Sequence, residues 1–213
     1  MQLAAVIVPP PDVVEDALVV ARGLVAAAPE VVPRQGRPGL LGRLLGRPDE
    51  EEPASIGLHE PEPSKVFVRL VKLGHVSEGD AASLIGTLRG LAEEWVAPVL
   101  HVSSVSIQDG GPPPVRAHLG GDVEALRSMV RQVDGAAAQH GITHKRRALR
   151  DEFSLGALDV PWALATGGSF AATREQRGRD WQPAHLTLVK ADQTRRGTLY
   201  VEVARLPLAA RAL

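Results

Sequence analysis

The sequence HLTLVK at residues 185–190 has a close counterpart half a chain earlier, FVRLVK at residues 67–72. In an extended strand residues i and i+2 lie on one face, so the imidazole of His185 and the hydroxyl of Thr187 share a face opposite an apolar one. The earlier stretch has an aromatic ring and a guanidinium at the same two positions. The two stretches therefore predict a pair of related strands whose polar faces have diverged.

Around these stretches, short apolar runs alternate with signals for helix starts. Asp12, Ser77 and Asp122 each precede a run of helical periodicity, as N-cap residues do, and predict three helices. Residues 29–64 are rich in Pro, Gly and charge, which predicts a flexible loop. The expected order is β α β α β β α, then residues 142–182 as an insertion, then two closing strands.

The composition is that of an ordinary globular protein. With 213 residues, 44% of them hydrophobic, the chain can form one large α+β domain of two similar lobes over residues 1–213. A net charge of −1 provides no overall field for nucleic acid or an anionic membrane. The absence of cysteine excludes disulfide partners and thiolate metal sites. No apolar run reaches the roughly 20 residues of a membrane span, so we expect a cytoplasmic protein.

The pattern of a histidine, an apolar residue and a threonine, with an apparent second copy in the other half of the chain, resembles the two-histidine phosphoesterase superfamily. This superfamily includes 2′-5′ RNA ligase-like proteins and cyclic phosphodiesterases. Its first motif strand and the next helix resemble the stretch FVRLVKLGHVSEGD. Its central hairpin and the following helix resemble VSSVSIQDGGPPPVRAHLGGDVEALRSMV, and its second motif resembles WQPAHLTLVKA. The resemblance implies antiparallel sheets in two lobes, helices packed outside, and a cleft to which each lobe supplies one motif strand.

The resemblance also implies a chemistry. Two imidazoles handle protons while the hydroxyls hold a phosphate, and a pKa near 6.5 lets imidazole act as acid or base near neutrality. His185 and Thr187 are then the catalytic residues, acting on a nucleotide or RNA terminus with a 2′,3′-cyclic phosphate or a 2′-5′ linkage. No cofactor is implied, and the sequence has no H-E-x-x-H or paired-carboxylate spacing that predicts a metal site.

The first motif departs from the family pattern, because Phe67 and Arg69 stand where the family has its His and its Thr or Ser. Phenylalanine cannot transfer a proton, and loss of one acid–base group typically costs about 10²- to 10⁴-fold in rate. Arg69 can still bind a substrate phosphate through the planar fork of its guanidinium. Two functions remain open: a phosphodiesterase with an altered site, and a non-catalytic nucleotide- or RNA-end-binding protein that retains only the second motif.

Other residues offer alternatives to this interpretation. His101 and Ser103 form a further H-x-S pattern and are a second candidate substrate-binding pair, in a register shifted by one strand. That register leaves residues 65–74 without a role. His59 and His75 are expected to face solvent. A third interpretation is that both strand stretches are purely structural, and the sequence has no signal for an oligomeric state.

Two basic clusters occur within residues 142–182. They bracket either a nucleic-acid groove or an ordinary solvated surface. Acidic residues lie among them, and the chain has only seven Phe, Trp and Tyr residues to stack on bases, which favours the solvated surface. The clusters consist of Lys145, Arg146, Arg147 and Arg150, and of Arg174, Arg177 and Arg179.

Overall fold

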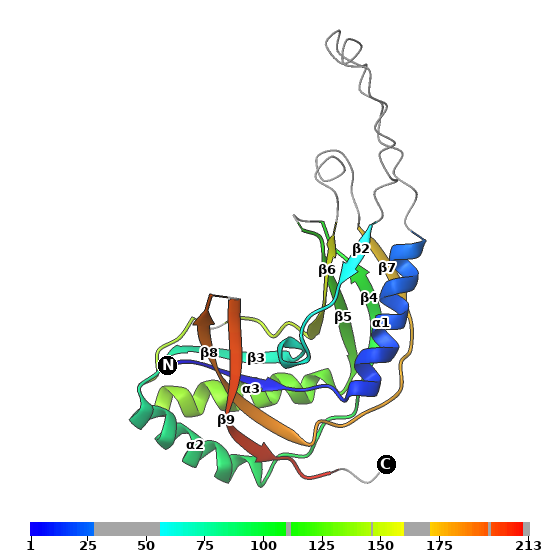
Figure 1. Ribbon diagram of the computed structural model, residues 1–213. Coiled ribbons are helices and arrows are strands. Elements are labelled where there is room, and N and C mark those ends of the chain that lie inside the picture. Colours follow the sequence, from blue (N-terminus) through cyan, green and yellow to red (C-terminus); the bar gives the residue numbers. More distant parts are fainter. Residues whose placement is uncertain (28–55, 110–111, 146, 160–170, 196, 211–213) are drawn as a thin grey trace, which may run out of the picture.

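The protein forms two antiparallel sheets with helices on their outer sides (Figure 1). The computed structural model describes residues 1–27, 56–109, 112–145, 147–159, 171–195 and 197–210. Sheet A has the strand order β3 (Val68–His75), β1 (Gln2–Ile7), β8 (His185–Thr194), β9 (Gly197–Pro207). Sheet B has the order β2 (Gly57–His59), β6 (Glu152–Asp159), β5 (Pro114–Gly121), β4 (Leu100–Ile107), β7 (Ala172–Glu175). The expected α+β fold of two antiparallel sheets is confirmed.

The helices begin close to the predicted positions. Helix α1 (Pro11–Ala26) starts with proline in its first turn, one residue before Asp12. At the start of α2 (Glu78–Ala92), the Ser77 hydroxyl accepts a hydrogen bond of 3.1 Å from the backbone N–H of Asp80, as predicted for an N-cap. Before α3 (Val123–Gln139), the side chain of Asp122 instead accepts from the backbone N–H of Val99.

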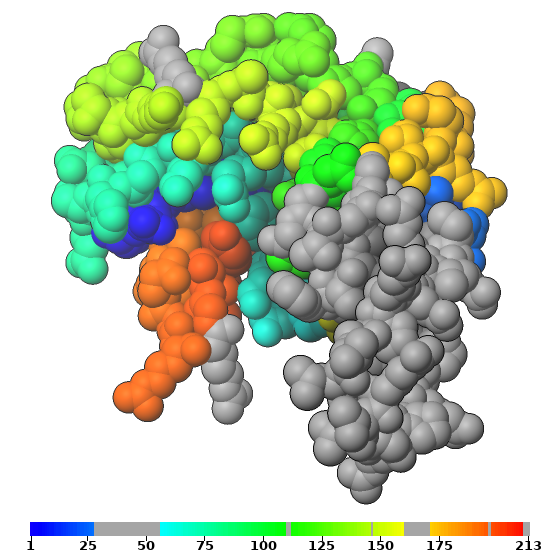
Figure 2. Space-filling view, turned by 90° about the horizontal axis from the view of Figure 1, so that it is seen from above, coloured from blue at the N-terminus to red at the C-terminus, as the bar shows by residue number. Residues whose placement is uncertain are grey.

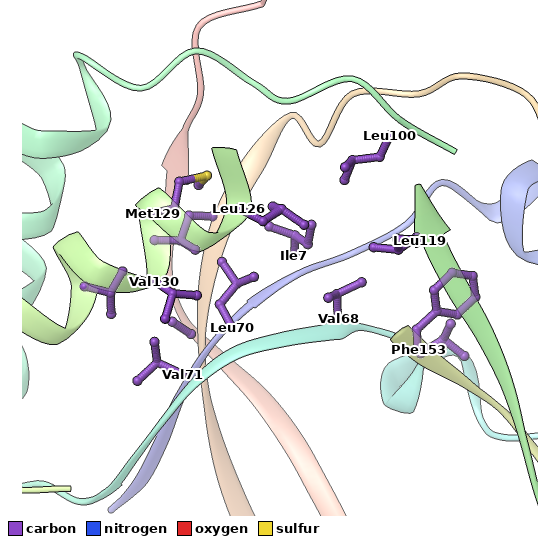
Figure 3. Packing of buried hydrophobic residues seen from close by; sticks show 14 of the residues in the cluster. Ile7, Val68, Leu70, Val71, Leu100, Leu119, Leu126, Met129, Val130 and Phe153 are labelled. Atoms are coloured by element: carbon purple, nitrogen blue, oxygen red, sulfur yellow. The ribbon is translucent and has the colours of Figure 1, made fainter. Parts of the chain in front are cut away.

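Two of these helices cross from one sheet to the other. Helix α1 follows β1 of sheet A but packs on β4 of sheet B, whereas α3 follows β5 of sheet B but packs on β3 of sheet A. Figure 3 shows Met129 and Val130 of α3 above Leu70 and Val71, with Ile7 close by. The exchange joins both sheets to one hydrophobic core.

The opposite face of sheet A carries a second, smaller apolar cluster. Ala4, Val6 and Val189 are buried there, and Phe67 and Tyr200 pack on them. The pairing of β1 with β3 is irregular between Ala5 and Val6, so two successive residues of β3 are both buried in the main core. The same irregularity keeps the neighbouring positions 69 and 72 exposed on the second face.

The predicted loop and the predicted insertion both contribute strands to sheet B. Most of the predicted loop at 29–64 falls outside the described residues, but its last part forms β2 and the short helix η1 (Pro63–Lys65). The stretch 142–182, expected to be an insertion, supplies β6 and β7 to sheet B. Within the described parts of the chain, no helix is both long enough and apolar enough to cross a membrane.

Candidate functional site

A cleft of about 580 Å³ lies between β3 of sheet A and β6 of sheet B. The rest of its lining comes from α3, from the segment that joins α3 to β6, from β5, from the start of β9 and from the residues before β3. Figure 2 shows this joining segment, in yellow-green, beside the cyan residues of β3. Because β3 and β6 belong to different sheets, the cleft is the place where the two lobes meet.

The cleft is strongly basic although the protein as a whole is nearly neutral. Seven Lys or Arg residues line it against two carboxylates, whereas the whole chain has a net charge of −1. A concave surface of one sign focuses the field and attracts ions of the other sign, so this cleft favours an anionic ligand. The cations are Lys65, Arg69, Lys72, Arg116, Lys145, Arg147 and Arg150, and the carboxylates belong to Asp134 and Glu152.

The wall formed by sheet A combines aromatic rings with cations. The rings of Phe67 and Tyr200 meet edge to face, with centroids 4.9 Å apart and an interplanar angle of 79°. The guanidinium carbon of Arg69 lies 5.7 Å from the centroid of the Phe67 ring, and Nη2 of Arg69 donates to the Tyr200 hydroxyl at 3.3 Å. These contacts hold the Arg69 guanidinium at the cleft wall while leaving other N–H groups for a ligand.

The wall formed by sheet B places a carboxylate among cations. Glu152 Oε1 lies 3.9 Å from Arg116 Nε and 4.0 Å from Arg150 Nη1, which are ion-pair separations rather than hydrogen bonds. Arg116 Nε is buried and has no hydrogen-bond partner. The Arg116 side chain as a whole is 29% exposed and lines the cleft, so an anion in the cleft can reach the exposed part of its guanidinium. Ser154 is paired with Arg116 and adds a hydroxyl to this wall.

A chain of polar contacts runs across three strands of sheet B toward the cleft. The hydroxyl of Ser106 on β4 and Nε2 of His118 on β5 are 2.7 Å apart, at hydrogen-bonding distance. Nδ1 of His118 lies 3.7 Å from Glu152 Oε2 on β6. Ser106 is buried, whereas the His118 side chain is 31% exposed. These contacts position the His118 imidazole beside the Glu152 carboxylate that lines the cleft.

His144 is the one imidazole among the described residues that line the cleft, and it is already engaged. Its Nε2 donates to Asp134 Oδ1 of α3 at 2.7 Å, and its side chain is only 6% exposed. The other ring nitrogen, Nδ1, is buried and has no hydrogen-bond partner. In this conformation the His144–Asp134 pair anchors the segment after α3 and does not offer a free imidazole to a ligand.

The structure separates the residues that the sequence singled out. Arg69 lines the cleft, but His185 and Thr187 lie on β8, in the same sheet as β3, and are outside the cleft lining. The expectation that the two related stretches come from different lobes is therefore corrected. They are two strands apart because β1 lies between them, and the strand of sheet B that meets β3 at the cleft is β6.

The alternative pair, His101 and Ser103, lies on β4 of sheet B and is also outside the cleft lining. Nδ1 of His101 is 3.5 Å from Asp180 Oδ1, and the Ser103 hydroxyl donates to the backbone carbonyl of His118 at 3.3 Å. A Cβ at Gly120 would lie 2.6 Å from Nε2 of His101, so glycine is needed for this imidazole to pack against β5.

Sequence reasoning missed several residues that the cleft brings together with Arg69, namely Arg116, Glu152, Ser154 and Tyr200. A signal for two of them is present in Glu152-Phe153-Ser154, which repeats the alternation of polar residue, apolar residue and hydroxyl seen at 185–187. In the described residues, no group of three His, Cys, Asp or Glu side chains is arranged to hold a metal ion.

No family model and no curated protein matches this sequence, but solved structures match over nearly its whole length. TT0787 of Thermus thermophilus has a TM-score of 0.65 and 13% identity, covering 100% of both chains. Apo LigT of E. coli has a TM-score of 0.60 and 14% identity, covering 98% of this chain and 97% of that one. LigT in complex with 3′-AMP has a TM-score of 0.58 and 14% identity, with 97% and 96% covered. The chain thus has the LigT-like two-histidine phosphoesterase fold.

Proposed function

We propose that the cleft binds the phosphorylated end of a nucleotide or RNA, with Arg69 and Arg116 as the principal phosphate ligands. The main support for this proposal is that seven cations but only two carboxylates line the cleft of a nearly neutral protein. Guanidinium groups donate paired hydrogen bonds to phosphate oxygens and suit such a site. LigT, which shares the fold, has been crystallised with 3′-AMP, with ATP and with phosphate, which supports this ligand class.

Binding without turnover is the function that the geometry supports best. At the cleft, β3 and the residue before it contribute Phe67 and Arg69, and β6 contributes Glu152 and Ser154. A two-imidazole mechanism needs one group to take a proton from water and another to protonate the departing ribose oxygen. Of the described lining residues only His144 has an imidazole, and it is hydrogen-bonded to Asp134.

A phosphodiesterase acting on 2′,3′-cyclic or 2′-5′-linked ends is the second candidate. Its supporting observation is that Thr187 lies across Val6 from Arg69, so both side chains are on the same face of sheet A. His185, two residues earlier, shares that face. Turnover requires His185 to reach the phosphate and to act as acid or base there, with Thr187 holding the phosphoryl group.

The test is equilibrium binding of 3′-AMP and 2′,3′-cyclic AMP to wild type, Arg116→Ala and Arg69→Ala, with turnover of the cyclic nucleotide measured in parallel. A charge-assisted hydrogen bond contributes about 1.5–3 kcal/mol, so each substitution should weaken binding about 10- to 150-fold. Arg127→Ala is the matched control, because Arg127 pairs with Glu124 on the exposed side of α3. Failure of wild type to bind, or an equal effect of the control, would overturn the proposal.

A further inference from the structure

Among the described residues, the exposed aromatic surface is concentrated in the cleft. Of the five Phe, Trp and Tyr residues in the described parts of the chain, Trp95, Phe153 and Trp181 are buried in the core. The other two, Phe67 and Tyr200, are half-buried, touch each other and line the cleft. We propose that these two rings form a platform on which the base of the bound nucleotide stacks. This inference rests on the phosphate-binding role proposed above.

The ring geometry suits a base. Because Phe67 and Tyr200 are nearly perpendicular, their mutual contact covers at most one ring face, and the pair forms a corner rather than a closed stack. The Arg69 guanidinium, held by the Tyr200 hydroxyl and lying over Phe67, adds a flat cation beside the rings. Aromatic faces and guanidinium planes are the groups on which proteins stack unpaired bases.

The platform is held rigidly before any ligand arrives. Both rings pack on Ala4, Val6 and Val189, which are buried on the cleft face of sheet A. Phe67 precedes β3 directly, and Tyr200 lies within β9, so both are attached to the sheet rather than to a long loop. A surface that is already ordered loses little conformational freedom on binding.

The position of the rings also indicates where the base and the phosphate of a nucleotide would bind. Arg69 and Lys72 lie on the aromatic wall, whereas Arg116 and Arg150 lie on the opposite wall with Glu152. A nucleotide has an aromatic base at one end and an anionic phosphate at the other, and matches both features. A sugar phosphate or inorganic phosphate matches only the cations. The geometry therefore assigns the apolar part of the site to the base.

The experiment compares 5′-AMP with ribose 5-phosphate, which differ only in the base, by calorimetric titration of the full chain. Base stacking should make 5′-AMP bind roughly 5- to 150-fold more tightly than ribose 5-phosphate. Phe67→Leu and Tyr200→Leu should bring this ratio close to one, because the loss of their contacts to Arg69 affects both phosphate ligands alike, whereas the loss of the ring affects only the ligand with a base. Tyr200→Phe retains the ring and should retain the ratio. Leu199→Ala, at an exposed neighbour on β9, is the control.

The outcomes distinguish this inference from the function on which it rests. Equal affinity of wild type for the two ligands would overturn base stacking but leave phosphate binding intact, whereas binding of neither would overturn phosphate binding itself. Equal losses for both ligands in the leucine variants would mean that the rings only support the sheet. A second experiment needs only the wild-type protein and measures the fluorescence of 2-aminopurine riboside 5′-phosphate, which stacking should quench. If the probe binds and its fluorescence is not quenched, the proposal is also overturned.

Discussion

Arg69 and Thr187 lie in one cross-strand row of sheet A, each paired with Val6 of the strand between them. Two strand spacings, about 9.6 Å, therefore separate their backbones. Arg69 is exposed in the cleft, whereas Thr187 is only 6% exposed and is paired on its other side with Arg205. The two similar stretches thus place these side chains on the same face of one sheet, but Arg69 is accessible to a ligand and Thr187 is not.

The first prediction concerns His185. Because it lies outside the described cleft lining, His185→Ala should change the affinity for 3′-AMP by less than about twofold, whereas Arg116→Ala should weaken it at least tenfold. Equilibrium dialysis with labelled nucleotide measures both. If wild type hydrolyses 2′,3′-cyclic AMP and His185→Ala does not, the phosphodiesterase is the correct function and the binding-only proposal is wrong.

The second prediction concerns the cations after α3. Lys145, Arg147 and Arg150 are exposed and line the cleft, so they are placed to follow a second or third phosphate of an RNA end. A double variant, Lys145→Ala with Arg147→Ala, should weaken a trinucleotide more than 3′-AMP. It should also reduce the slope of log affinity against log salt by about 0.7 for each lost phosphate contact. Identical effects on both ligands would indicate a solvated surface instead of a nucleic-acid path.

The third prediction concerns Glu152, whose carboxylate lies near Arg116 and Arg150. Glu152→Gln removes a negative charge from the cleft without changing side-chain size. At about 6 Å in water, one unit charge acts on another with about 0.7 kcal/mol, so 3′-AMP should bind about threefold more tightly or better. Titration at low and at high salt measures the effect, which should shrink as salt screens the charges. Weaker binding would mean that Glu152 contacts the ligand or positions Arg116.

The fourth prediction concerns pH and Glu124 in the first turn of α3. Hydrogen bonds from Arg127 and Arg131 hold the pKa of Glu124 below its usual 4.5. A carboxyl with a lowered folded-state pKa contributes stability that is present above pH 4.5 and is lost as pH falls through the lowered pKa. Glu124→Gln should therefore slightly lower the unfolding midpoint in urea at pH 7 and not at pH 2. A difference that persists at pH 2 would indicate a cause other than ionisation.

Local signals in the sequence predicted the order of most elements. The cap at Ser77, the hairpin that forms β4 and β5, and the closing strands β8 and β9 follow from local signals, because capping, turn chemistry and side-chain periodicity act over only a few residues. The placement of Arg69 on an exposed strand face follows from the same periodicity. β6 carries the same alternation in Glu152 and Ser154, within a stretch that looked like an insertion.

Which strands face each other across the cleft depends on long-range packing rather than on local signals. β1 comes to lie between β3 and β8, and β6 takes the position across the cleft, because each sheet must bury its apolar face against a helix that crosses from the other lobe. That choice depends on pairings between residues more than 100 positions apart, such as Val6 with Thr187, which no local pattern encodes. The candidate site therefore combines Arg69, Arg116, Glu152 and Tyr200, which the strands of the two sheets bring to one cleft.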